Sequence, residues 1–149
     1  MAETRSQKPI EFFFYCEKLA EKHYPEAHRL MQILYPDLPY DEFLHRLKRQ
    51  LAQTYLVMNG DDVLGLFSLS RFVNMIAGDV AYLEEMVIAP EYQGAGLGRK
   101  VVEHILSQLK QEGRVSLYTD DSTPQGSRHG FLNGCGAKKV SNFYEFTVN

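Results

Sequence analysis

The sequence is poor in the residues that mark several classes of protein. It contains no tryptophan and only two cysteines, Cys16 and Cys135, which are too few and too far apart for a disulfide framework or a zinc site with paired thiols. No stretch approaches the ~18 consecutive apolar residues that span a bilayer, and the polar residues 1–8 are unlike a secretion signal. We therefore expect reduced, buried thiols, no membrane partner and a cytoplasmic location.

Positive charge is not in excess either. Sixteen Lys and Arg residues stand against nineteen Asp and Glu residues, for a net charge of -3. A nucleic-acid partner is not expected, because the phosphate backbone is bound through excess positive charge. The histidines do not follow a metal-binding pattern, since His23 and His28 are five residues apart and no His-Glu-x-x-His run occurs. No metal is expected.

The remaining composition is that of a globular protein. With 44% hydrophobic and 23% charged residues over 149 positions, the chain can bury a core of the size of one ordinary domain. No internal repeat and no linker divides it. We therefore predict a single domain over residues 1–149.

Hydrophobic periodicity predicts a mixed α/β order of elements. The Asn59-Gly60 pair indicates a hairpin, and the strand, loop, helix and strand that follow residue 80 indicate a parallel crossover. Strands are predicted over residues 10–16, 54–58, 63–70, 80–88 and 115–119. Helices are predicted from near Pro25, over residues 40–53, and from Leu97 to near Gly113. A short helix within residues 124–134 and a hairpin from residues 137–140 and 143–148 complete the prediction.

The segment that carries chemistry is the run QGAGLG at residues 93–98, between a strand and an amphipathic helix. Its glycines leave backbone N–H groups unshielded at a helix N-terminus, where a phosphate binds well. A dinucleotide fingerprint does not fit, because the sixth position counted from Gly94 is Arg99. A nucleotide-hydrolysing P-loop does not fit either, because Lys100 is followed by Val101 rather than by a hydroxyl residue. A tight turn with no ligand is the structural alternative.

Residues 87–98 (VIAPEYQGAGLG) resemble the acetyl-CoA motif of the GNAT superfamily of N-acetyltransferases, and the order of elements is similar to that family over nearly the whole chain. The resemblance implies one GNAT-like α/β domain, with a mixed sheet, an antiparallel first half, flanking helices and parallel strands splayed around acetyl-CoA. Homodimerisation is compatible with it. The cofactor-binding residues it implies are Met86, Val87, Ile88, Gln93, Gly94, Ala95, Gly96, Leu97, Gly98 and Arg99, acting largely through their backbone.

Two adjacent carboxylates are the candidates for the base that an attacking amine needs. Glu84 and Glu85 interrupt an otherwise apolar strand, and adjacent strand residues are expected to point to opposite faces of the sheet. By the family resemblance Glu85 is the first candidate and Glu84 the second, with Glu85 alternatively holding the substrate's ammonium group. Both could instead be structural, one solvated and one in a salt bridge.

The sequence lacks the residue that the family often uses as the acid for the leaving thiolate. Where the family often has tyrosine, this sequence has Leu132 after Phe131. His129 is the first substitute, followed by Tyr144 and Tyr118, and solvent is an alternative proton source. Cys135 is better interpreted as a packed thiol than as a nucleophile.

We therefore predict an acyl-CoA-dependent N-acetyltransferase that passes acetyl from acetyl-CoA to a primary amine of a small molecule or peptide by direct attack. The alternative is a non-catalytic acyl-CoA-binding sensor or interaction module, which Leu132 motivates. A third possibility is a purely structural domain whose glycines only turn the chain.

Overall fold

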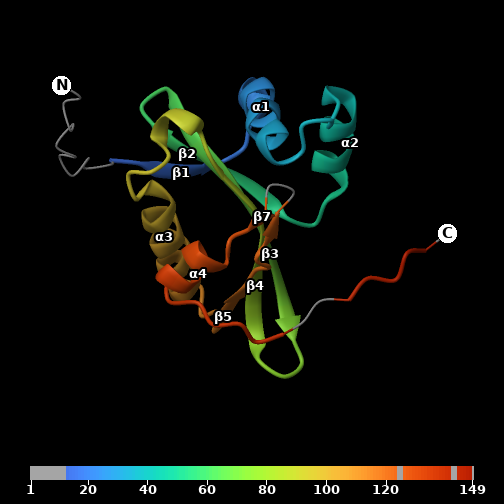
Figure 1. Ribbon diagram of the computed structural model, residues 1–149, viewed down its shortest axis with the longest axis vertical. Coiled ribbons are helices and arrows are strands. Elements are labelled where there is room, and N and C mark those ends of the chain that lie inside the picture. The colour runs from blue at the N-terminus through green and yellow to red at the C-terminus, as the bar shows by residue number, and fades with distance from the viewer. Residues whose placement is uncertain (1–12, 124–125, 142–143, 149) are drawn as a thin grey trace.

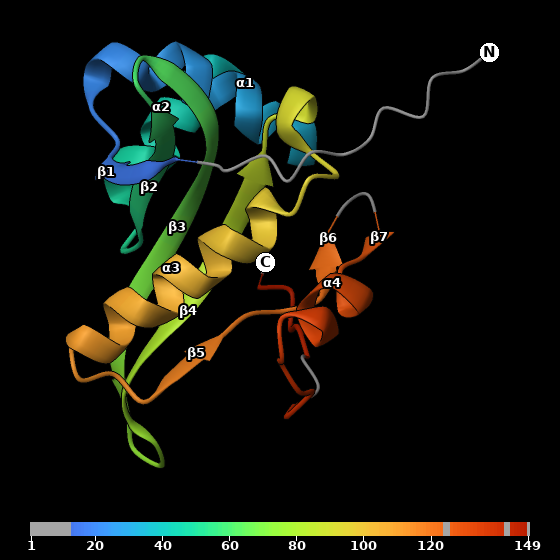
Figure 2. The same cartoon turned by 90° about the vertical axis from the view of Figure 1, so that its left-hand side faces the viewer.

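A central sheet separates two layers of helices (Figures 1 and 2). The computed structural model describes residues 13–123, 126–141 and 144–148. Helix α3 (Leu97–Gln111) crosses one face of the sheet, while α1 (Tyr24–Leu34) and α2 (Tyr40–Arg49) lie against the other. Each face has its own buried apolar cluster, so the core consists of two layers.

Five strands form the sheet, in the order β1-β2-β3-β4-β5. Their bounds are β1 Tyr15–Lys18, β2 Gln53–Asn59, β3 Asp62–Asn74, β4 Gly78–Ile88 and β5 Ser116–Tyr118. Neighbours from β1 to β4 pair antiparallel, whereas β4 and β5 pair parallel with α3 as the crossover. The predicted antiparallel first half and parallel crossover are confirmed.

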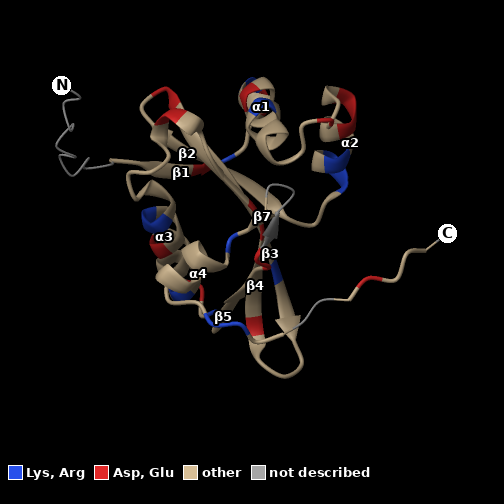
Figure 3. Ribbon diagram, viewed as in Figure 1, with Lys and Arg blue, Asp and Glu red and all other residues tan. Residues whose placement is uncertain are grey.

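The helix boundaries follow local chemistry. Pro25 stands in the first turn of α1, where its missing N–H costs little. Helix α2 begins with Asp41 and Glu42 and ends with basic residues, which suits the helix dipole (Figure 3). The shorter elements are η1 Glu21–His23, η2 Pro90–Tyr92, β6 Ser122–Thr123, β7 Gly126–Ser127 and α4 His129–Gly134.

Several boundaries differ from the prediction, and sheet pairing explains two of them. The first strand runs over β1, later than the predicted residues 10–16, of which residues 10–12 lie outside the described part. Tyr15 pairs with Met58, and β2 ends one residue later at Asn59. Residues before Tyr15 therefore have almost no partners left on β2. Helix α2 stops at Arg49 rather than at residue 53, because Gln53 already pairs with Leu69 in the sheet.

The C-terminal hairpin prediction is wrong for the residues that the structure describes. Residues 137–141 and 144–148 carry no strand, and residue 143 of the predicted hairpin lies outside the described ranges. Tyr144, Phe146 and Val148 alternate as a strand would, but their side chains are exposed. Alternation gives a segment the capacity to pair, whereas a strand also needs a neighbour to pair with.

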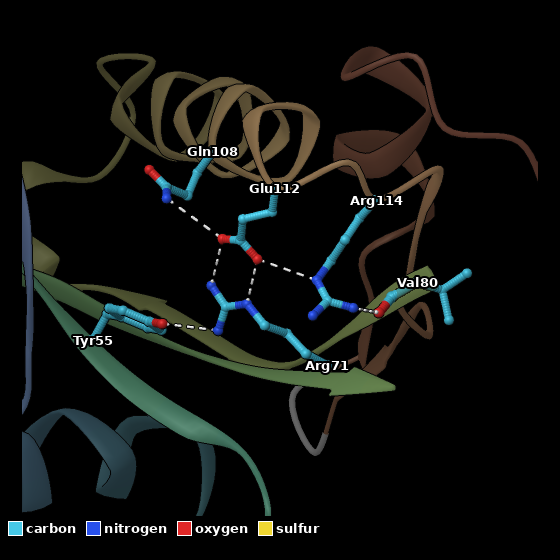
Figure 4. Close-up of polar contacts among 6 residues, drawn as sticks. All are labelled: Tyr55, Arg71, Val80, Gln108, Glu112 and Arg114. Carbon is cyan, nitrogen blue, oxygen red and sulfur yellow. Dashed lines mark hydrogen bonds and ion pairs between the residues drawn. The ribbon is translucent and has the colours of Figure 1, made fainter. Parts of the chain in front are cut away.

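A polar network fastens the end of α3 to the sheet (Figure 4). Arg71 of β3 donates two hydrogen bonds to Glu112, at 2.7 and 3.0 Å, and a third to the Tyr55 hydroxyl at 2.8 Å. Arg114 donates to Glu112 at 3.1 Å and to the Val80 carbonyl of β4 at 2.9 Å. These guanidinium groups, Arg71 first, lower the pKa of Glu112 to about 2. The network holds α3 at the end opposite to the glycine loop.

Two further observations bear on the class of protein. Within the described ranges, no helix combines the length and apolar character needed to cross a bilayer. Cys16 and Cys135 are both free thiols, as expected, but they are half-buried rather than buried.

Candidate functional site

A cavity of about 600 Å³ lies where the end of β4, the glycine loop and α4 meet. Eight of the ten residues predicted to hold the cofactor line it: Met86, Ile88, Gln93, Gly94, Gly96, Leu97, Gly98 and Arg99. Tyr92, Arg128 and Phe131 complete the lining. The structure therefore brings most of the predicted residues to one concave surface.

The other two predicted cofactor residues do not line this cavity. Val87 is buried in the cluster under α1 and α2, on the opposite face of β4 from Met86. Ala95 is exposed at the tip of the loop. The side chain of Val87 therefore faces away from the cavity.

The loop needs its glycines for their backbone geometry. Gly94 and Gly96 have φ values of 81° and 85°, in the left-handed region that side chains disfavour. Gly96 is the N-cap of α3, and Lys100 is the first residue to donate back to it, at 3.2 Å. The amides between them precede the helical ladder, and in the described part of the chain no side chain caps this end.

The first turn of α3 suits an anion. It holds no acidic residue, and it carries Arg99 and Lys100 where the helix dipole favours negative charge. Arg99 has only a loose ion pair with Glu103 at 3.5 Å, and both side chains are mostly exposed. This end of the helix is therefore positively charged and open to the cavity.

Two contacts hold the loop in place. The Gln93 side chain donates a 2.8 Å hydrogen bond to the carbonyl of Ile88, so it anchors the loop to the end of β4. Gly98 lies under the ring of Phe131, whose nearest atoms would stand 3.3 Å from a Cβ at that position. The cavity wall from α4 thus depends on the absence of a side chain at Gly98.

The two parallel strands separate beside the cavity. Pairing of β4 with β5 ends at Tyr82 and Tyr118, while β4 continues to Ile88. Beyond that point the Thr119 hydroxyl donates to the carbonyl of Leu83 at 3.0 Å. The geometry agrees with the splayed strands that the sequence resemblance implied.

The expectation that Glu84 and Glu85 point to opposite faces is wrong. A β-bulge sets both residues opposite Ser68, because Phe67 pairs with Met86 while Leu69 pairs with Leu83. The extra residue in β4 turns both carboxylates toward the face covered by α1 and α2.

The hydrogen-bond partners agree with this orientation. Ser70 donates to Glu84 at 2.9 Å, and the Ser68 hydroxyl is the partner of Glu85. These serines are two residues apart on β3 and share one face.

The two carboxylates differ in their surroundings. Glu84 is exposed, whereas Glu85 is partly buried. Burial raises the pKa of Glu85, the Ser68 hydroxyl lowers it, the charge of Glu84 adds to the rise and Arg128 opposes it. Burial therefore gives Glu85 a greater affinity for a proton than an ordinary glutamate has, which suits a general base.

Residues to which the sequence assigned no individual role lie near this pair. Tyr35 follows α1, and burial and the charges of Glu85 and Asp120 raise its pKa. Tyr82 donates to Asp120 at 2.9 Å, and burial first, then this bond, raises the pKa of Tyr82 to about 12. Tyr35 and Asp120 come from distant parts of the sequence, and no local pattern signals that they meet.

The predicted substitutes for the acid are not brought to the cavity. His129 is exposed at the start of α4, and its neighbour Arg128 lines the cavity instead. Tyr144 is exposed in the C-terminal segment, and Tyr118 pairs with Tyr82 in the sheet. No cluster of three or more His, Cys, Asp or Glu residues suitable for a metal ion occurs within the described ranges.

The model of the acetyltransferase (GNAT) family matches residues 17–136. The chain belongs to this family. Membership confirms the predicted resemblance to the GNAT superfamily. A curated relative, the [ribosomal protein bS18]-alanine N-acetyltransferase of Salmonella typhimurium (strain LT2), is 31% identical over 65 residues. That match covers 44% of this chain and 41% of the relative's length.

Solved structures of GNAT proteins share the fold. A ribosomal-protein-alanine N-acetyltransferase from Brucella melitensis superposes with a TM-score of 0.77 at 10% identity, covering 91% of this chain and 99% of that one. An aminoglycoside N-acetyltransferase in complex with CoA gives a TM-score of 0.73 at 14% identity, covering 91% and 94%. An aminoglycoside acetyltransferase from an uncultured soil sample, in complex with sisomicin, gives 0.71 at 16% identity, covering 92% and 97%. These likenesses confirm the predicted fold class.

Proposed function

We propose that this GNAT protein transfers the acetyl group of acetyl-CoA to the primary amine of a small molecule or peptide by direct attack. The observation that carries the proposal is the cavity itself, which joins an anion-binding helix start to the open end of β4. The cytoplasmic location expected from the sequence belongs to the same proposal.

In this proposal the pyrophosphate of acetyl-CoA binds the amides of residues 94–98. The left-handed conformations at Gly94 and Gly96 and the positive end of α3 support this assignment. The pantetheine arm follows Met86 and Ile88 toward the separation of β4 and β5. This path carries the thioester from the α3 face toward the acidic face of β4.

The acceptor amine approaches from the side of α1, where both glutamates point. The acceptor attacks as the neutral amine after its ammonium form has lost one proton to solvent, and Glu85 takes the second proton from that nitrogen as it bonds to the thioester carbon, directly or through a water molecule. Glu84, with Ser70 fixing one of its oxygens, attracts the cationic acceptor before it loses its proton. Proximity and orientation supply much of the rate.

A thiol-release assay tests this proposal. Acetyl-CoA is incubated with the protein and a panel of polyamines, aminoglycosides, amino acids and short peptides, and free CoA is measured. Turnover with any amine supports the transferase. Tight binding of acetyl-CoA without turnover over the whole panel would instead favour the non-catalytic sensor that Leu132 motivates.

Matched variants sharpen the test. Glu85→Gln is expected to lower kcat by 10²-fold or more at neutral pH with little effect on acetyl-CoA affinity. Glu21→Gln, at an exposed carboxylate of η1, is the control and should leave both unchanged. Gly96→Ala should weaken CoA binding because its φ disfavours a side chain, although no neighbouring atom would clash. Unaltered CoA affinity in Gly96→Ala would argue against the assigned phosphate site.

A further inference from the structure

Arg128 stands between the cofactor cavity and the acidic face. It precedes α4 and lines the cavity beside Phe131. Its Nη2 donates to the Thr119 hydroxyl at 3.2 Å and to the Asp120 carbonyl at 2.8 Å. Because the Thr119 hydroxyl in turn donates to Leu83 of β4, the guanidinium is fixed where the two parallel strands separate.

Among the described residues these contacts position the positive charge without an ion pair. Both acceptors, a hydroxyl and a backbone carbonyl, are uncharged oxygens. The Nε atom is buried, and it has no hydrogen-bond partner within the described part of the chain. Burying a polar group without a partner is costly, so its retention at this site points to a function.

The charge of Arg128 also reaches the acceptor face. It lowers the pKa of Glu85, Tyr35 and Tyr82, although other effects on each group are larger. Leu132, where a proton-donating tyrosine is often found, cannot assist the leaving sulfur. The site therefore holds a fixed cation beside the cavity, and Leu132 stands where the family often has its acid.

Building on the acetyl transfer proposed above, we propose that Arg128 is a catalytic residue that stabilises the CoA thiolate as the carbon–sulfur bond breaks. The nitrogen lone pair of the acceptor forms the new bond to the carbonyl carbon. The electron pair of the breaking bond stays on sulfur, and the proton of the attacking nitrogen passes to Glu85. The guanidinium keeps its proton throughout, because arginine does not deprotonate in proteins. The thiolate leaves as such or takes a proton from water.

The decisive experiment measures the ionisation of bound CoA rather than turnover. The thiolate is followed by its ultraviolet absorbance while CoA in complex with the protein is titrated with base. The thiol is expected to ionise at lower pH in the wild-type complex than in free CoA. Arg128→Met should return it to the free value, and Arg128→Lys should lie between the two. Arg46→Met, which removes an exposed cation of α2 outside the cavity lining, should leave the shift intact.

Steady-state kinetics provides a second test of the role of Arg128. Arg128→Met is expected to lower kcat by about 10²-fold, as removal of one charge-stabilising donor does elsewhere, with a much smaller change in KM for acetyl-CoA. Melting curves of the variants, with and without CoA, establish that they fold and bind.

The outcomes separate the two proposals. If bound CoA has the same thiol pKa in the wild type and in Arg128→Met, the role of Arg128 is overturned while acetyl transfer stands. A rise in KM with unchanged kcat would likewise make Arg128 a binding group only. If the wild type does not bind CoA, both the proposed function and the proposed role of Arg128 are overturned.

Discussion

A Cβ atom on Gly65 of β3 would stand 2.5 Å from the carbonyl oxygen of Val87 in β4. Gly65 pairs with Ile88 at the end of β4 that enters the cavity, so the close approach of two backbones sets where this strand end lies. The backbone of Gly65 is not in the left-handed region. The requirement for glycine at this position is therefore steric.

The first prediction concerns this contact. Gly65→Ala should destabilise the protein by about 1 to 3 kcal/mol, as overpacking does, because the neighbouring atom belongs to the backbone and cannot rotate away. It should also weaken CoA binding, since the end of β4 must shift. Urea unfolding and CoA titration measure the two effects. Gly134→Ala, where a Cβ meets nothing within 4 Å, is the control; equal stability of the two variants would contradict the prediction.

The packing of Phe131 on Gly98 gives a second prediction. Gly98→Val should push the ring out of its place in the cavity wall and weaken CoA affinity by about tenfold, or 1.4 kcal/mol. Adding Phe131→Leu should restore part of the loss, because the smaller side chain makes room. Calorimetric titration of the single and double variants forms the cycle. Strictly additive losses would show that the two positions are not coupled through this contact.

Glu85, the proposed general base, should lower the stability of the folded protein at neutral pH. Its pKa is raised above the ordinary 4.5, so its charged form costs stability at every pH above the folded-state value. That cost disappears as the pH falls below 4.5 and both states become protonated. Glu85→Gln should therefore melt at a higher temperature than the wild type near pH 7, by about 2 to 4 °C for each kcal/mol, and the difference should vanish in acid. Melting curves between pH 4 and pH 8 test this, and a lower melting temperature at pH 7 would contradict it.

The opposite sign is expected for Glu112. Its folded-state pKa is lowered from 4.5 to about 2, so its contribution to stability is complete above pH 4.5 and is lost as the pH falls toward 2. Glu112→Gln should be less stable than the wild type at neutral pH, and the two should converge near pH 2. Denaturant unfolding as a function of pH measures the convergence. A constant difference across that range would mean that packing, not charge, accounts for the loss.

Local sequence determined much of this protein. Period-two and helical patterns placed the strands and helices, and three glycines between a strand and a helix indicated the end of α3 to which we assign the phosphate site. These features depend on neighbouring residues, so they can be recognised without the rest of the chain. The boundaries of β1 and α2 could not be, because Met58 and Leu69, the pairing partners, lie far along the sequence.

Tertiary structure alone decided how the chemical groups are arranged. The bulge opposite Ser68 turned Glu84 and Glu85 to one face, which strict alternation along a strand would forbid. Arg128 reached the cavity in place of His129, because Thr119 and Asp120 hold its guanidinium at the separation of the strands. Register and long-range hydrogen bonds depend on which segments meet in space, and no spacing along the chain encodes them by itself.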